Sequence, residues 1–492
     1  MNERLHSKLH GMRRPYRYRI ALFGAVVGGL GSVCANAGQL SLNASEHFVS
    51  ANVASAGDGT RGRPYRTLRE AESASSPGDT IYVLSSMGTL DGGIELQPRQ
   101  RLIGLGPNGA LATNPADRVR VTNSTAPPGG VMVTLSDHNE VAGFHFRNMR
   151  NHAITGVDRD YSGTYIHHTT FSGNASVHIE DERGLVYAIA FDATAGLRAD
   201  VRVEDSRFAD GEDLGAIRVF QSGNSRGDYR FERNSFSDLG GRAYFVRTQH
   251  RSYVETMILD STADNIGRGD RNSDSIIPYL MGQSEQLMLI RNYRFDNSRQ
   301  EGNRSNTGIE AFMFGEPRPD EANWCTGCTL TLKILDSVLE NAVTDSIQFS
   351  NSGRNSQLSY EIRNTRIIGG NPQQGGGGIS LNLQSVSDSG GRTTLLVEST
   401  DVVGTTGYGF AVTNRGGGAH DLIVDLGGGV LGSRGRNRIL DNAKGAIRVP
   451  LTPVSAQYNW WGGSVPVIVN TDDQAFGTAN VIVVPPLRAD PR

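Results

Sequence analysis

A six-residue pattern of apolar and polar positions recurs along the middle of the chain. Each copy begins with an apolar residue, usually has a small polar residue in third place, and ends with an apolar or small residue. Because the shortest intervals between copies are nearly constant and the longer ones look like insertions, the pattern predicts an internal structural repeat. The ten copies begin at Val141, Ile166, Val203, Phe231, Ile258, Ile290, Ile334, Ile362, Val397 and Val424.

The third position of the repeat predicts a tight turn, and a second strand signal follows each turn. Asp and Asn tolerate left-handed backbone geometry and bond their own backbone in turns. The second signal, as in Gly215–Val219 and Gly378–Leu383, alternates apolar with other residues, and period-2 alternation directs one set of side chains into a shared core. We therefore expect an all-β solenoid of stacked coils. The turn residues are Asp205, Asp260, Asn292, Asp336, Asn364 and Ser399.

Composition agrees with a turn-rich β-protein. Glycine fills 61 of the 492 positions, which disfavours helices, while 18 Pro and 37% hydrophobic residues are unlike a disordered chain. The formal net charge is −3, and no run of Lys or Arg follows the N-terminal region. Nothing therefore indicates a nucleic-acid partner. Only Lys8, Lys333 and Lys444 are lysines, and this strong preference for Arg is typical of a GC-rich bacterial genome.

The N-terminus predicts a signal peptide over residues 1–37. Basic residues precede the apolar run from Ile20 to Val33, and Ala35-Asn36-Ala37 supplies the small residues of a cleavage site. A twin-arginine signal and a lipidated Cys34 remain alternatives. No later stretch is apolar enough to span a membrane, so we expect a secreted or periplasmic protein. The basic residues are Arg13, Arg14, Arg17 and Arg19.

Cys325 and Cys328 are the cysteines left after such cleavage, in the sequence Trp324-Cys325-Thr326-Gly327-Cys328. A local disulfide is the favoured interpretation. Redox activity would require a helix N-terminus in a βαβ setting, which the surrounding strand-like segments do not provide. Free thiols are the remaining alternative, and a zinc site would need two further ligands.

The ends of the predicted solenoid carry a family resemblance. The segments Gly57–Thr60, Arg63–Ala71 and Pro77–Val83, together with the C-terminal Tyr458–Gly463, resemble the right-handed parallel β-helix proteins of the pectate lyase-like superfamily. The resemblance implies a short helix near Thr67–Ser75 that caps the first coil. It implies one domain over 38–492, with a cap at about 46–105, coils at about 106–450 and a closing segment at about 451–492.

The resemblance also implies where a substrate would lie. In catalytic members of the superfamily it lies in a groove along one parallel sheet, formed by the strand after the short turn of each coil. Residues beside such strands in the stretch 213–345 are therefore site candidates. The catalytic candidates are Asp274, Glu310 and Asp345, with Arg271 and His178 as possible bases. The binding candidates are Arg218 and Arg247 for a carboxylate, and Tyr244 and Tyr279 for stacking on a sugar.

Coil spacing suggests how the carboxylates could work together. Neighbouring coils are about 4.8 Å apart, so Asp274 and Glu310, one coil apart, fit the separation of retaining glycosidases. Asp274 and Asp345, two coils apart, fit the wider inverting separation. The loop Asp264–Asp274 has carboxylates suited to Ca²⁺, although a solvated charged loop is the commoner interpretation. We expect a protein acting on an extracellular polysaccharide by β-elimination or hydrolysis, with a non-catalytic adhesion or carbohydrate-binding scaffold as the alternative.

Overall fold

A computed structural model describes most of the chain from residue 44 onward, and residues 44–492 form one compact unit. The predicted signal peptide, 1–37, lies outside the described residues. Among the described residues, no helix is long and apolar enough to cross a membrane. The described ranges are 44–55, 57–124, 130–149, 151–157, 159–173, 186–194, 196–267, 273–298, 306–313, 325–351, 353–370, 376–383, 390–414, 420–449, 453–463, 466, 468–469 and 481–491.

Three parallel sheets account for almost all of the regular structure. The 15-stranded sheet contains β1 (Glu46–Val49), β2 (Thr80–Leu84), β5 (Arg101–Leu105), β8 (Glu140–Ala142), β11 (Thr164–His167), β14 (Arg198–Glu204), β17 (Arg226–Glu232), β20 (Tyr253–Leu259), β23 (Glu285–Arg291), β26 (Thr329–Leu335), β29 (Gln357–Arg363), β32 (Gly391–Glu398), β35 (His420–Gly427), β38 (Val454–Ala456) and β40 (Val481–Ile482). The 12-stranded sheet contains β3 (Leu90–Asp91), β6 (Val119–Thr122), β9 (Phe144–Arg147), β12 (Thr170–Ser172), β15 (Arg207–Gly211), β18 (Ser235–Leu239), β21 (Thr262–Ile266), β24 (Arg294–Asp296), β27 (Val338–Glu340), β30 (Arg366–Ile368), β33 (Asp401–Val403) and β36 (Arg438–Leu440). The 13-stranded sheet contains β4 (Ile94–Glu95), β7 (Val133–Thr134), β10 (Ile154–Val157), β13 (Val186–Ala193), β16 (Leu214–Gln221), β19 (Tyr244–Thr248), β22 (Ile276–Leu280), β25 (Ile309–Met313), β28 (Ile347–Asn351), β31 (Ile379–Leu383), β34 (Tyr408–Asn414), β37 (Gly445–Arg448) and β39 (Ile468–Val469).

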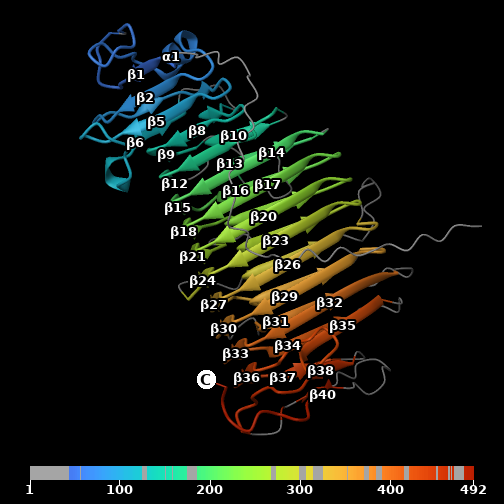
Figure 1. Cartoon of the computed structure of the whole chain (residues 1–492). Helices are drawn as coiled ribbons and strands as arrows, with labels where there is room; N and C mark the ends of the chain where they lie inside the picture. The colour runs from blue at the N-terminus through green and yellow to red at the C-terminus, as the bar shows by residue number, and fades with distance from the viewer. Residues whose placement is uncertain are drawn as a thin grey trace, which may run out of the picture. The chain divides into compact units, whose positions relative to one another are not determined.

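From β2 to β37 each coil contributes one strand to each sheet. The chain passes from the 15-stranded to the 12-stranded to the 13-stranded sheet, as in β20, β21 and β22, and then starts the next coil at β23. Figure 1 shows the strands stacked in chain order along the solenoid. The fold is therefore a parallel β-helix, as the sequence predicts, and parallel crossovers of this kind wind right-handed. The sequence pattern revealed two strands per coil, whereas the structure has three. The strands of the 12-stranded sheet are the ones that the pattern did not reveal.

The short turn that the repeat predicts lies between the 15-stranded and 12-stranded sheets. From β14 to β33 it always contains two residues, such as Asp205 and Ser206 between β14 and β15. The first of the two has a positive φ in every coil, for example 48° at Asp205 and 53° at Asn292. The predicted left-handed geometry is thus confirmed, and Arg233, with φ of 53°, adopts it as well.

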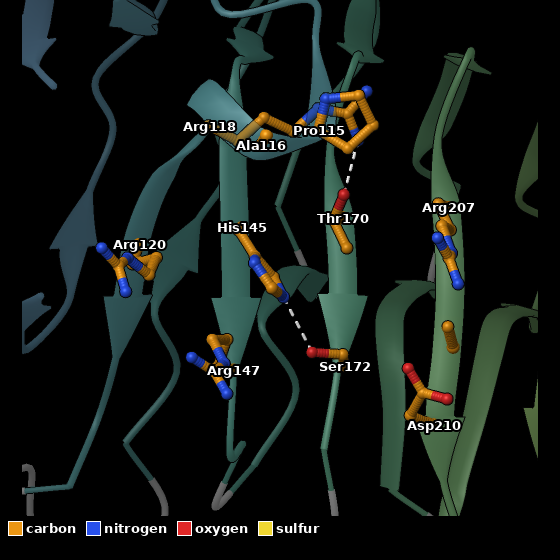
Figure 2. Close-up of a pocket in the computed structure, with 11 residues that line it drawn as sticks. Pro115, Ala116, Arg118, Arg120, His145, Arg147, Thr170, Ser172, Arg207 and Asp210 are labelled. Atoms are coloured by element: carbon orange, nitrogen blue, oxygen red, sulfur yellow. Dashed lines mark hydrogen bonds between the residues drawn. The ribbon is translucent and has the colours of Figure 1, made fainter. Parts of the chain in front are cut away.

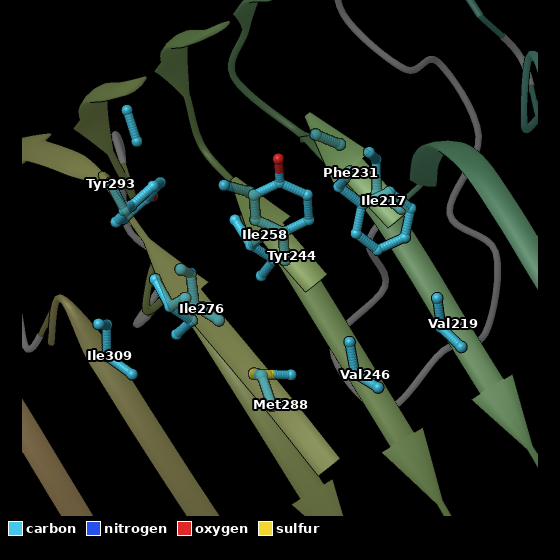
Figure 3. Packing of buried hydrophobic residues seen from close by; sticks show 14 of the residues in the cluster. Ile217, Val219, Phe231, Tyr244, Val246, Ile258, Ile276, Met288, Tyr293 and Ile309 are labelled. Atoms are coloured by element: carbon cyan, nitrogen blue, oxygen red, sulfur yellow. The ribbon is translucent and has the colours of Figure 1, made fainter. Parts of the chain in front are cut away.

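The core is built from in-register stacks of inward side chains. On the 12-stranded sheet Phe146, Phe171, Phe208 and Phe236 pair in register, with ring centroids 5.3, 4.7 and 5.0 Å apart. Ile217, Tyr244 and Ile276 form a matching stack on the inner side of the 13-stranded sheet (Figure 3). Because every coil adds the same kind of residue at the same register, apolar burial continues through successive coils.

Two small helical segments lie near the start of the solenoid. The helix α1 (Leu68–Ala74) begins after Thr67, whose side chain accepts the N–H of Glu70 at 3.2 Å, and the 3₁₀ helix η1 covers Pro115–Asp117. The N–H of Thr67 in turn donates to Oε2 of Glu70 at 3.4 Å, which completes a capping box. The helix lies where the sequence places it; that it caps the first coil stays a prediction.

Candidate functional site

Two rows of side chains run across the outer face of the 13-stranded sheet. They arise because alternate residues of each strand face outward and the strands pair in register. The first row contains Arg218, Phe245, Ile277, Glu310, Gln348 and Ser380. The second row contains Asp192, Phe220, Arg247, Tyr279, Phe312, Ser350 and Asn382.

The second row forms an aromatic–arginine stack over four successive coils. The guanidinium of Arg247 lies 5.4 Å from the ring centroid of Phe220 and 5.5 Å from that of Tyr279. All four side chains from Phe220 to Phe312 are partly exposed. The stack therefore presents the edges of aromatic rings and a cation to the outside of the sheet. This combination suits a ligand with both apolar and polar surfaces.

Arg218 is held by a neighbour on the same face. Its Nη2 lies 2.6 Å from Oδ2 of Asp192, and both side chains are less than a fifth exposed. The guanidinium also lies 5.8 Å from the ring centroid of Tyr187. Because its charge is matched within the protein, Arg218 is less suited to binding a substrate carboxylate than the sequence prediction assumes.

Asp274 and Asp345 occupy equivalent positions in their coils, two residues before the first residues of β22 and β28. The N–H of Ser275 bonds the carbonyl of Thr307, and the N–H of Gly308 bonds that of Asp345, at 3.1 and 3.3 Å. This register places Thr307 beside both aspartates, one coil from each. At about 4.8 Å per coil the two aspartates are about 10 Å apart along the stack, close to the range that an inverting glycosidase uses.

Each of these aspartates also accepts a backbone N–H from the next coil. Asp274 Oδ1 accepts from Thr307 at 2.8 Å, and Asp345 Oδ1 accepts from Gly377 at 3.0 Å. Asp274 is 3% exposed. Burial raises the pKa of the Asp345 carboxyl, although bonds from Ser380 and Gly377 act in the opposite direction. Asp345 is thus a carboxyl group that keeps its proton to a higher pH than an ordinary aspartate.

The predicted pairing of Asp274 with Glu310 is wrong. Ile276 pairs with Ile309 and Tyr279 with Phe312, so Glu310 lies beside Ile277, three residues along the strand from the level of Asp274. Three residues of strand span about 10 Å, which removes the close spacing of a retaining pair. Glu310 Oε1 instead accepts a bond from Gln348 at 2.8 Å.

Two further expectations about this face need correction. Tyr244 does not stack on a ligand, because its ring is wholly buried against Phe231 and Phe236 in the core (Figure 3). The outward residue of that strand is Phe245. The strands named as the site also do not follow the short turn directly, since a strand of the 12-stranded sheet lies between. Phe220, Phe245 and Phe312 belong to the face and were missed.

The other candidates have different positions. Arg271 and His178 lie outside the described residues, as does part of the loop considered for Ca²⁺. Among the described residues, no three His, Cys, Asp or Glu side chains gather as a cation site. Cys325 and Cys328 form a disulfide and are wholly buried. The N–H of Thr326 bonds the carbonyl of Gly282 at 2.7 Å, so the disulfide is part of a stack of turns.

Comparisons with known proteins give a likeness to solved structures. No protein-family model matches the chain, and no curated protein matches it. The catalytic domain of a GH87 α-1,3-glucanase in complex with nigerose is 12% identical, with a TM-score of 0.45, over 82% of this chain and 66% of that one. A mannuronic acid specific polysaccharide family 6 lyase from human gut microbiota is 11% identical, with a TM-score of 0.41, over 87% and 83%. PfbA, a surface adhesin of Streptococcus pneumoniae, is 10% identical, with a TM-score of 0.35, over 77% and 86%.

Proposed function

We propose that the protein binds an extended polysaccharide across the coils, on the outer face of the 13-stranded sheet. The observation that carries this proposal is the stack of Phe220, Arg247, Tyr279 and Phe312 on four successive strands. The exposed edges of the aromatic rings offer apolar surface to the C–H groups of sugar rings, and the arginine favours a sugar that bears a carboxylate. Because the stack crosses coils, the ligand is a polymer or long oligomer rather than a single sugar.

We further propose hydrolysis of a glycosidic bond by Asp345 and Asp274. Asp345, whose pKa is raised by burial, acts as the acid that protonates the leaving oxygen. Asp274, two coils away, acts as the base toward a water molecule on the other side of the sugar. The spacing supports inversion of configuration at the bond that is cleaved.

A non-catalytic binding scaffold is the second candidate, and one observation favours it. Each of the two aspartates holds a backbone N–H of the following coil, and Asp274 is almost completely buried. These are the features of carboxylates that stabilise a stack of turns. In that case the aromatic–arginine stack alone would carry the function, as an adhesion or carbohydrate-binding surface.

The deciding experiment compares binding and cleavage on the same substrates. The purified protein is incubated with acidic and neutral polysaccharides, and new reducing ends and the ultraviolet absorbance of unsaturated products are followed. We expect reducing ends without unsaturated products, and their loss in Asp345→Asn. The matched control is Asp200→Asn, an exposed aspartate on the 15-stranded sheet.

The other outcomes separate the alternatives. Unsaturated products would replace hydrolysis by β-elimination. Binding without any product, weakened by Tyr279→Ala, would establish the scaffold instead. A protein that binds none of the polysaccharides would contradict the proposed function altogether.

A further inference from the structure

A pocket of about 470 Å³ opens on the outer face of the 12-stranded sheet, away from the face discussed above. Its lining comes from η1 and from strands β6, β9, β12 and β15 (Figure 2). The residues that carry the argument are Arg118, Arg120, His145, Arg147, Thr170 and Arg207. Pockets of this size accommodate small organic molecules.

Strand register assembles this pocket from distant parts of the sequence. Arg120 pairs with His145, His145 with Thr170, and Thr170 with Arg207. Arg147 lies on the same outer face in the neighbouring row, beside Ser172. Four coils thus bring their outward polar residues to one spot, and Figure 2 shows them projecting from adjacent strands.

The pocket concentrates positive charge in a chain whose net charge is negative. Four arginines and a single acid, Asp210, line it. Two arginines elsewhere on the outer face of this sheet are paired, Arg294 with Glu340 at 3.0 Å and Arg438 with Asp401 at 3.1 Å. Within the described part of the chain, none of the four pocket arginines forms an ion pair.

Hydrogen bonds hold the guanidinium of Arg118 in the lining of the pocket. Its Nη1 donates to the carbonyl of Thr169 at 2.8 Å and to Oγ1 of Thr170 at 2.5 Å, and its Nη2 donates to the carbonyl of Thr113 at 3.1 Å. The residue is 7% exposed. These acceptors are neutral, so they orient the guanidinium without matching its charge. Burial, followed by the nearby Arg207, lowers the pKa of Arg118 to about 10.

The pKa of His145 is affected by the same group of arginines. Its Nε2 lies 2.7 Å from Oγ of Ser172. Burial, and then the charges of Arg147, Arg118, Arg120 and Arg207, lower its pKa to about 4. The imidazole is therefore neutral at pH 7. A bound anion would oppose the arginines and make protonation of His145 easier.

We propose that this pocket binds a phosphate or sulfate ester carried by a sugar. Planar guanidinium groups pair in a bidentate way with tetrahedral oxyanions, and several of them together can bind all the terminal oxygens of such a group. The Ser172 hydroxyl and the Thr170 hydroxyl line the same space and suit the sugar hydroxyls. The volume exceeds what one oxyanion fills, which favours an ester over the free ion. The site lies on a different sheet and is independent of the proposed polysaccharide face.

Titration calorimetry of the purified protein tests this proposal. The probes are glucose 6-phosphate, glucose 6-sulfate, inorganic phosphate, inorganic sulfate and glucose. We expect one ester to bind more tightly than its free ion, while glucose does not bind, and the tighter ester identifies the group. Arg147→Gln and Arg207→Gln should each weaken binding about tenfold, the effect of losing one charged hydrogen bond.

The control variant is Arg294→Gln, which removes a paired arginine from the outer face of the same sheet and should leave binding unchanged. Histidine NMR gives a second readout that does not depend on the variants: the pKa of His145 should rise when the ester is bound. Absence of saturable ester binding in the millimolar range would overturn the proposal. An equal loss of binding in Arg294→Gln, or an ester no tighter than the free ion, would also overturn it.

Discussion

The ring of Phe312 lies parallel to the ring of Tyr279, with centroids 5.4 Å apart and planes inclined by 7°. They belong to neighbouring coils, β25 and β22, and both rings are partly exposed. We expect Tyr279→Ala to weaken polysaccharide binding about tenfold, because a central aromatic contact is commonly worth more than 1 kcal/mol. Affinity electrophoresis in gels that contain the polysaccharide measures this. Tyr253→Ala, on the 15-stranded sheet, is the control, and an equal loss in both variants would contradict the assignment of the face.

Asp345→Asn should stabilise the fold at neutral pH while it abolishes hydrolysis. The folded-state pKa of Asp345 is raised, so the folded protein resists ionisation of this carboxyl more than the unfolded chain does. The stability contributed by the protonated group is therefore present below the unfolded pKa and is lost as the pH rises through the folded pKa. The amide keeps the acceptor for the N–H of Gly377 and carries no charge. Denaturant titrations at acidic and neutral pH measure the effect, and a variant that is less stable than the wild type at neutral pH would refute it.

Acid should destabilise the protein through His152. This histidine is almost completely buried, its Nδ1 lies 2.8 Å from the carbonyl oxygen of Tyr187, and burial lowers its pKa to about 4. Between the unfolded pKa of about 6.5 and the folded value, only the unfolded chain takes up the proton, so the free energy of unfolding falls by up to about 3 kcal/mol as the pH drops. The variant His152→Asn should lose less stability over this range. His138→Asn, at an exposed histidine, should behave as the wild type does, and parallel curves for all three proteins would exclude this role.

Phe208→Ala should destabilise the protein by about 3–5 kcal/mol, the usual cost of removing a buried phenylalanine. Phe208 is wholly buried and contacts Phe171 and Phe236 on either side, so the cavity interrupts the stack in both directions. Phe208→Leu, which refills most of the volume, should cost clearly less. Urea unfolding followed by circular dichroism provides both values. Equal losses in the two variants would mean that the stacking geometry, rather than the volume, carries the energy.

The architecture could be predicted because its turn chemistry is local. Asp, Asn or Ser at the third position of six of the ten repeats adopts positive φ, so a short-range rule indicates where most coils bend. In several coils the third strand, such as β24 or β27, has only three residues, which contain too little alternation to be recognised.

The orientation of side chains was harder to predict than the strands themselves. Tyr244 and Arg247 were both expected on the outer face, yet they are three residues apart in one strand and must face opposite sides. Since Arg247 faces outward, alternation alone assigns Tyr244 to the core and Phe245 to the surface. The sequence alone therefore shows that the two expectations conflict, and the structure shows which of them fails.

The basic pocket was missed because coils of unequal length separate its residues. His145, Thr170 and Arg207 each lie four residues after a copy of the repeat, at Val141, Ile166 and Val203. Aligning the chain on the repeat, rather than on sequence distance, would have placed these three residues side by side. Arg118 would still have been missed, because it reaches the pocket from the end of η1, outside the strands.

The invariant two-residue turn has a consequence for how such a molecule can change. From β14 to β33 all differences in coil length fall at the two other corners, and both of these flank the 13-stranded sheet. Segments inserted there leave the register of the three sheets intact. New recognition chemistry can therefore be grafted beside the proposed ligand face, by evolution or by engineering, while the buried stacks that stabilise the fold remain untouched.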